Sequence, residues 1–192
     1  LKFFVVMALL FLAQVLIGGG LAHYRTEPGS FYGFDLAAYL PSNLLRTWHL
    51  QSAIFWVVTA YIGGGLFLAD ALGSREPRGQ VRGINLLWAA LLLVVGGSMI
   101  GELVGINQLA GTLWFWFGDQ GWEYLDLGRA WQVLLVLGLG AWVVLLARTI
   151  GPARHDPERR EIATLFLISA ATIPLFYLPA FFFGSATRFT VV

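Results

Sequence analysis

Five long apolar segments, separated by shorter polar connections, dominate the pattern of hydrophobic and polar positions along the chain. A helix needs about 20 apolar residues to cross the roughly 30 Å hydrocarbon core of a bilayer, and each segment reaches that length. The pattern therefore predicts an all-α, polytopic membrane bundle that forms one transmembrane domain over residues 1–192. Its five helices are expected at 3–22, 45–71, 84–104, 130–150 and 162–183.

The composition agrees with a membrane protein and excludes several other classes. Apolar residues make up 58% of the chain and charged residues only 12%, whereas a soluble domain has about 25% charged residues. The absence of cysteine excludes a disulfide framework, a thiolate metal site and c-type haem attachment. A net charge of +1 gives no sign of a nucleic-acid partner.

The first apolar segment follows Lys2, as the apolar region of a signal peptide would. It is too long for that role, and no small-residue cleavage site clearly follows it. Because the chain also begins with Leu, we expect an internal fragment of a longer protein.

The basic residues predict how the helices are oriented. Eight of the twelve Lys and Arg residues fall on the side of the amino end, and four fall on the other side. The positive-inside rule then places the amino end in the cytoplasm of a multi-pass protein, expected in a bacterial inner membrane. The outer loops are longer and contain most of the unusual chemistry, so we expect function on the outer face.

The second segment, RTWHLQSAIFWVVTAYIGGGLFLA, contains an ionisable residue. His49 lies about one turn, or ~6 Å, inside its outer end, and ionisable residues in membrane helices are functional candidates. A mostly small face continues below it at helical spacing: Ala53, Trp56, Ala60, Gly63 and Gly64. This face suits an axial haem ligand with a flat macrocycle beneath it. It equally suits a histidine that hydrogen-bonds a neighbouring helix, with the small residues mediating helix packing.

Several motifs follow one another in a recognisable order: AHYRTEPGSFYGFDLAAYLP, RTWHLQSAIFW, EPRGQ, GELVGI and LWFWFGDQGWEYLDLGRAWQ. Over essentially all 192 residues the sequence resembles the catalytic chain of quinol-dependent nitric oxide reductases, in the haem–copper oxidase superfamily. The TWH and WFGDQGWEYLDLGR segments separate that family from ordinary oxidases. The resemblance implies that the five helices belong to a larger haem–copper-oxidase-type bundle. It also implies that His49 is an axial ligand of a low-spin haem b, in an enzyme of denitrification that couples nitric oxide to nitrous oxide.

His23 and Glu27 lie four residues apart just beyond the first segment. They form a donor and acceptor pair suited to a quinol, because one group accepts a hydroxyl proton while the other hydrogen-bonds the second oxygen. A solvated loop start is the alternative. The resemblance implies that this stretch contributes to the quinol pocket. Phe31, Tyr32 and Phe34 form either an apolar wall for the ring or a membrane-interface belt.

Glu123 and Asp126 are spaced i, i+3 and share one face if the turn is helical. Two carboxylates suit a hard cation such as calcium. The resemblance implies a calcium ion near haem propionates, with Glu123 as its ligand. Asp126 is expected to cap a helix, contact solvent or support the ligand. The surrounding tryptophans are expected to be interfacial anchors: Trp114, Trp116, Trp122 and Trp131.

The resemblance also implies a high-spin haem b3 beside a non-haem iron held by three histidines and a glutamate. The chain has three histidines in all, and they do not cluster in sequence. We therefore expect this centre to lie in the remainder of the chain and the fragment alone to be inactive. Expected partners are membrane lipid, quinol, nitric oxide, the rest of its own chain and, in a homodimer, a second copy.

Two other classes remain open from the sequence. One is a non-catalytic haem-b membrane anchor in which His23 and His49 ligate one iron, and the other is a cofactor-free, transporter-like bundle. Glu102, at the outer end of the third segment, is expected to be hydrated, with proton uptake as the alternative. The titratable groups within or beside the bilayer gather at the outer end, so we expect the chemistry to draw its protons from that side.

Overall fold

The computed structural model of the protein describes residues 1–28, 30, 32–73, 76–109, 111–118 and 127–182. Within these residues five helices are long and apolar enough to cross a membrane, and no β-strand is present, which confirms the all-α prediction. They are α1 (Lys2–Thr26), α2 (Ser42–Leu72), α3 (Gln80–Ile106), α5 (Arg129–Ile150) and α6 (Arg160–Phe182). Every predicted boundary lies within four residues of the observed one.

Short helical turns occupy parts of the connections. A 3-10 turn, η1 (Leu36–Ala38), lies between α1 and α2, and η2 (Gly111–Leu113) leads into the short helix α4 (Trp114–Phe117). A further turn, η3 (Gly151–His155), joins α5 to α6.

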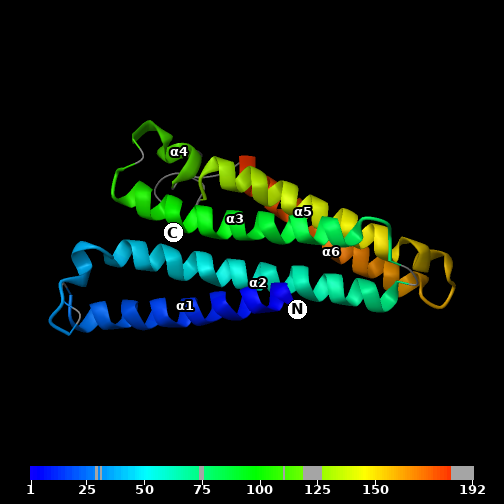
Figure 1. Ribbon diagram of the computed structural model, residues 1–192, viewed down its shortest axis with the longest axis horizontal. Helices are drawn as coiled ribbons and strands as arrows, with labels where there is room; N and C mark the ends of the chain where they lie inside the picture. The colour runs from blue at the N-terminus through cyan, green and yellow to red at the C-terminus, as the bar shows by residue number, and fades with distance from the viewer. Residues whose placement is uncertain (29, 31, 74–75, 110, 119–126, 183–192) are drawn as a thin grey trace.

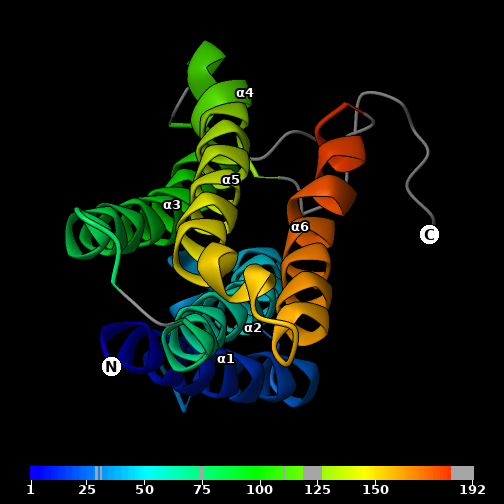
Figure 2. The ribbon, with the colours of Figure 1, turned by 90° about the vertical axis from the view of Figure 1, so that its right-hand side faces the viewer.

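The long helices form a bundle with one peripheral member. Figure 1 shows α1 and α2 running side by side in opposite directions, with α3, α5 and α6 on the other side of α2. Seen end-on, α5 lies between α3 and α6, and α1 occupies the edge (Figure 2). Helix α2 contacts α1, α3 and α5, whereas α1 packs mainly against α2. The pairing of α1 with α2 therefore decides the environment of their facing side chains.

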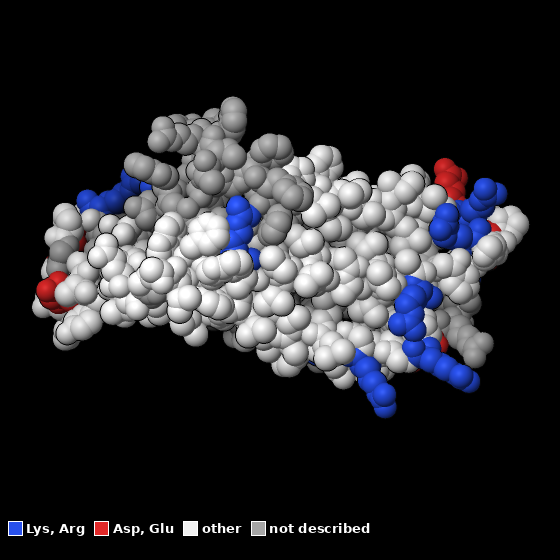
Figure 3. Space-filling view, turned by 90° about the horizontal axis from the view of Figure 1, so that it is seen from above, with Lys and Arg blue, Asp and Glu red and all other residues white. Residues whose placement is uncertain are grey.

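The outer surfaces of the helices are apolar. Large aliphatic side chains such as Leu9, Leu12 and Leu16 of α1 are exposed. In the view of Figure 3, most Lys and Arg side chains lie toward the two ends, with a broad and largely uncharged band between them. Exposed apolar surface on this scale is not tolerated in water but is what a bilayer core requires.

Small residues bring the helices together inside the bundle. A methyl group on Gly65 of α2 would lie 2.7 Å from the ring of Trp142, and one on Gly97 of α3 would lie 2.2 Å from the ring of Trp131. Glycine at these positions lets each indole lie directly against a helix backbone. Close backbone approach through small residues is a major source of helix association in lipid.

Interhelical hydrogen bonds form near both ends of the bundle. Trp48 of α2 donates from Nε1 to the carbonyl oxygen of Met99 in α3 at 2.9 Å. At the opposite end, Gln80 of α3 donates from Nε2 to Oγ1 of Thr149 in α5, also at 2.9 Å. Because no water in the hydrocarbon core can satisfy such groups, these bonds fix the register of neighbouring helices.

Candidate functional site

His49 lies in α2 with its ring in the contact between α2 and α1. Its Nδ1 atom is 3.0 Å from the main-chain carbonyl oxygen of Gln14. A carbonyl only accepts, so the ring proton of the neutral imidazole belongs on Nδ1 and the lone pair on Nε2. In the described part of the chain, Nε2 has no hydrogen-bond partner. Metal-ligating histidines typically show this arrangement, with one ring nitrogen donating to a carbonyl and the other bound to the metal.

Gly18 of α1 provides the space in which the imidazole lies. A methyl group at this position would be 2.8 Å from Cε1 of His49 and 3.1 Å from Nδ1. The neighbouring Gly19 has no heavy atom within 4 Å of the equivalent point. Gly18 is therefore the glycine of the GGG run that the imidazole requires.

The side chain of Gln14 also forms a hydrogen bond with Trp56 of α2. Sequence analysis made no prediction for Gln14. Its Oε1 accepts a hydrogen bond of 2.6 Å from Nε1 of Trp56. The ring of Phe11 packs edge-on against Trp56, with centroids 5.5 Å apart. Gln14 is the one polar side chain between Lys2 and His23. A lone amide in a lipid-facing helix is the signal that would have identified it.

The small-residue face of α2 contacts α1 and also borders a cavity. His49, Trp56 and Gly63 face α1, where a methyl on Gly63 would lie 3.1 Å from Cβ of Phe3. Ala60 and Gly64 also border an apolar cavity between α2, α5 and α6. The helix-packing interpretation therefore describes Gly63.

Gln51 and Glu102 form a buried polar contact between α2 and α3. Nε2 of Gln51 donates to Oε1 of Glu102 at 3.1 Å, and the two side chains are only 2% and 1% exposed. The expectation that Glu102 is hydrated is therefore wrong. Helix α3 continues beyond this residue to Ile106, and its side chain turns toward α2 and not toward the membrane surface.

His23 lies in the last turn of α1 and Glu27 directly follows that helix, whereas both were expected just beyond its end. Nε2 of His23 is 3.1 Å from Oε2 of Glu27. The ring of Tyr32 lies 4.9 Å from the imidazole, centroid to centroid, and Ser30 donates to Oε1 of Glu27. Glu27 remains partly accessible, with 45% of its side chain exposed. The pair is thus ordered at the surface, beside one of the expected aromatic residues, while Phe34 is exposed.

Glu123, the predicted calcium ligand, and Asp126 lie outside the described residues, as do Phe31 and Trp122. The flanking tryptophans are described. Trp114 and Trp116 of α4 are exposed, as interfacial anchors would be. Trp131 differs, because its Nε1 donates to the carbonyl oxygen of Phe117 at 2.8 Å and its ring covers Gly97.

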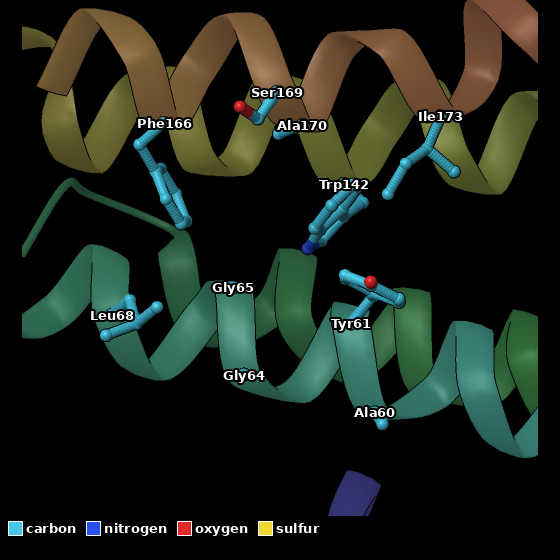
Figure 4. Close-up of a pocket in the computed structure, with 10 residues that line it drawn as sticks. All are labelled: Ala60, Tyr61, Gly64, Gly65, Leu68, Trp142, Phe166, Ser169, Ala170 and Ile173. Carbon is cyan, nitrogen blue, oxygen red and sulfur yellow. The ribbon is translucent and has the colours of Figure 1, made fainter. Parts of the chain in front are cut away.

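An apolar cavity of about 370 Å³ opens between α2, α5 and α6. Figure 4 shows Gly64 and Gly65 on its α2 side, Trp142 projecting from α5, and Phe166, Ser169 and Ile173 on α6. Its lining contains no carboxylate, imidazole or amine. The hydroxyl groups in the lining belong to Tyr61 and Ser169.

No three His, Asp or Glu side chains come together as a metal site within the described ranges. His49 is thus a single ligand, and any iron it holds needs its other axial ligand from another segment or molecule. The donor chemistry fits a haem nonetheless, because Nδ1 is occupied, Nε2 is available and Gly18 gives the ring room.

The fold is that of a helical, multi-pass membrane bundle, and one ring nitrogen of His49 has no hydrogen-bond partner among the described residues. Residues 1–191 match the sequence profile of cytochrome c and quinol oxidase polypeptide I. The chain belongs to this family, the first subunit of the haem–copper oxidases, and has a redox function of that type. A search of individually characterised proteins gives no match to the chain. Proteins of this family generally bind haem, which argues against the cofactor-free, transporter-like alternative.

Proposed function

We propose that this chain is part of the catalytic chain of a quinol-dependent nitric oxide reductase, and that His49 is an axial ligand of its low-spin haem b. The observation that carries the proposal is the contact between Nδ1 of His49 and the carbonyl oxygen of Gln14. It fixes the tautomer in which Nε2 presents a lone pair. When bound, the haem supplies a one-electron carrier between quinol and the site of nitric oxide reduction.

The choice of nitric oxide reductase within the family rests on sequence motifs. The TWH segment and the WFGDQGWEYLDLGR segment resemble those of nitric oxide reductases and not those of ordinary oxidases. The HYRTE segment resembles the quinol-dependent branch. Part of the second motif, including the proposed calcium ligand Glu123, lies outside the described residues, so the calcium site is proposed on the resemblance alone.

His23 and Glu27 are proposed to bind the quinol. An ionised Glu27 can accept the proton of one quinol hydroxyl, and an N–H of His23 can donate to the other oxygen. The 3.1 Å contact between them keeps both groups at one place, and the exposed side of Glu27 lets an incoming hydroxyl reach it. Tyr32, beside the imidazole, offers a ring face for the quinol.

A non-catalytic haem-b anchor is the alternative function. It requires His23 to ligate the same iron as His49. In the structure Nε2 of His23 lies 3.1 Å from a carboxylate oxygen of Glu27, whereas Nε2 of His49 has no hydrogen-bond partner among the described residues. The two imidazoles therefore have different partners, one a carboxylate and the other a main-chain carbonyl. This difference favours the reductase over the anchor.

The test uses the full-length protein, purified with its haems. His49→Ala should abolish the low-spin haem b spectrum while the high-spin haem signal persists and reports an intact fold. His155→Ala is the matched control, because it removes an exposed histidine from the opposite end of the bundle. A low-spin spectrum unchanged in His49→Ala would refute the ligand assignment. Loss of the same spectrum in His23→Ala would favour the anchor.

A further inference from the structure

Trp56 follows His49 by seven residues in α2, and both side chains contact α1. Seven residues are about two helical turns, so the two side chains leave nearly the same face of α2. A single residue of α1, Gln14, supplies the hydrogen-bond acceptor for each of them. Its main-chain carbonyl oxygen lies 3.0 Å from Nδ1 of His49, and its side-chain Oε1 accepts from Nε1 of Trp56 at 2.6 Å.

The opposite directions of the two helices explain how one residue reaches both partners. Helices α1 and α2 run antiparallel (Figure 1). In an α-helix the main-chain carbonyl groups point toward the carboxyl end, whereas the side chains tilt toward the amino end. The carbonyl of Gln14 therefore points toward the end of the bundle that carries His23, where His49 lies. Its side chain extends the other way, toward Trp56, which lies deeper in the span.

The bond between Trp56 and Gln14 has one possible direction. An indole N–H can only donate, so the amide atom that faces it must be the oxygen of Gln14. No water in the hydrocarbon core could replace this acceptor, which makes the bond costly to break. The ring of Phe11, one turn before Gln14, also packs edge-on against Trp56. These contacts tie the position of Gln14 along α1 to Trp56 of α2.

The other contacts around His49 do not tie α1 to α2 in this way. Within the described residues, both hydrogen bonds between these two helices involve Gln14. Gly18 gives the imidazole room but offers no directional side-chain bond. Trp48 donates to the carbonyl oxygen of Met99, so it ties α2 to α3 instead. The carbonyl that faces His49 therefore depends on Trp56 for its position.

We propose that Trp56 is a positioning residue for the haem ligand, which acts through Gln14 to keep a carbonyl acceptor on Nδ1 of His49. The inference rests on the proposed role of His49 as a haem ligand. Donation from Nδ1 to a carbonyl makes the imidazole a stronger electron donor through Nε2, and this favours ferric over ferrous iron. Without the Trp56 bond, α1 can shift, the donation weakens and the haem becomes easier to reduce.

The experiment is a redox titration of the low-spin haem in the full-length, haem-loaded protein, followed by visible absorption. Trp56→Phe removes the indole donor and keeps an aromatic ring. Gln14→Leu removes the side-chain acceptor, so the bond is tested from both helices. Trp48→Phe is the matched control, because it removes the other indole hydrogen bond of α2, which joins α3 at 2.9 Å. The high-spin haem spectrum reports whether each variant is folded.

Trp56→Phe and Gln14→Leu should each raise the midpoint potential, and the double variant should shift it no further. Loss of an outer-shell partner changes metal affinity by about tenfold or more, and tenfold corresponds to about 59 mV for one electron. Trp48→Phe should lower stability without moving the potential. Loss of the low-spin signal in both test variants, but not in Trp48→Phe, would also support the proposal.

Two results would overturn the inference. One is an unchanged potential in Trp56→Phe, and the other is an equal shift in Trp48→Phe, which would indicate general loosening of the bundle. The proposed haem ligand is tested separately by His49→Ala. If that variant loses the low-spin haem while Trp56→Phe leaves the potential unchanged, only the role of Trp56 is wrong.

Discussion

Gln14 and His49 connect two helices at the point where the candidate ligand lies, through a contact of 3.0 Å between the Gln14 carbonyl oxygen and the His49 ring. The acceptor is a main-chain atom in a regular part of α1, so no substitution of the Gln14 side chain removes it. The orientation of the proposed haem ligand therefore depends on how closely α1 approaches α2. This dependence leads to the first prediction.

Gly18→Ala should disturb the haem ligand although it changes no ligand atom. The added methyl would lie 2.8 Å from Cε1 of His49, so the imidazole or α1 must shift. Overpacking of this kind costs about 1–3 kcal/mol. We expect an altered low-spin haem spectrum and a lower thermal unfolding midpoint. Gly19→Ala, where the methyl meets no atom within 4 Å, should change neither. Identical spectra for both variants would show that Gly18 does not position the ring.

The contact between Gln51 and Glu102 should contribute to the stability of the bundle. Gln51→Leu removes a donor from a carboxyl group that is 1% exposed, and such a loss costs about 1–3 kcal/mol. Glu102→Gln keeps an acceptor oxygen for Gln51 and should cost less than Glu102→Leu. Thermal unfolding of the full-length variants measures both differences. If Glu102→Leu were as stable as the parent protein, the contact would be energetically neutral.

Substitution of His23 or Glu27 by Ala should impair the use of quinol selectively. Removing one proton acceptor or donor from a reacting group typically lowers a rate by about a hundredfold or more. We expect that loss in quinol-driven turnover, and little loss with an artificial donor that reduces the haem directly. Asp35→Asn serves as the control, because it alters an exposed carboxylate of the same connection. Equal losses with both donors would place the pair outside the quinol site.

Turnover in reconstituted vesicles should not build a membrane potential. The middle of the five helices contains no Asp, Glu, Lys, Arg or His, and His49 and Glu102 lie near the end that carries His23 and Glu27. A proton path from the cytoplasm normally needs intramembrane polar groups along its length. A potential-sensitive dye records the outcome during quinol-driven nitric oxide reduction. A potential that grows with turnover would mean that protons cross from the cytoplasmic side.

The sequence identified candidate site residues, but it did not predict which side chains surround them. His49 was identified because an ionisable group in an apolar run is costly, and His23 and Glu27 because they form a donor and acceptor pair suited to a quinol. Gln14 was missed, although it is the one polar side chain in the middle of α1. Glu102 was expected at the surface because it lies near the end of its helix, but the end of a helix does not determine which way a side chain turns.

The sequence by itself determined the five membrane-length helices, their boundaries to within four residues, and membership of the haem–copper oxidase family. Span formation depends on the local transfer of apolar residues into lipid, which composition along the chain already expresses. Only the tertiary structure decided that His49, Trp56 and Gly63 face α1 and that Glu102 is buried against Gln51. Hydropathy cannot make those distinctions, because lipid tails and a neighbouring helix are equally apolar environments. Which side of a span faces protein is set by close packing and interhelical hydrogen bonds.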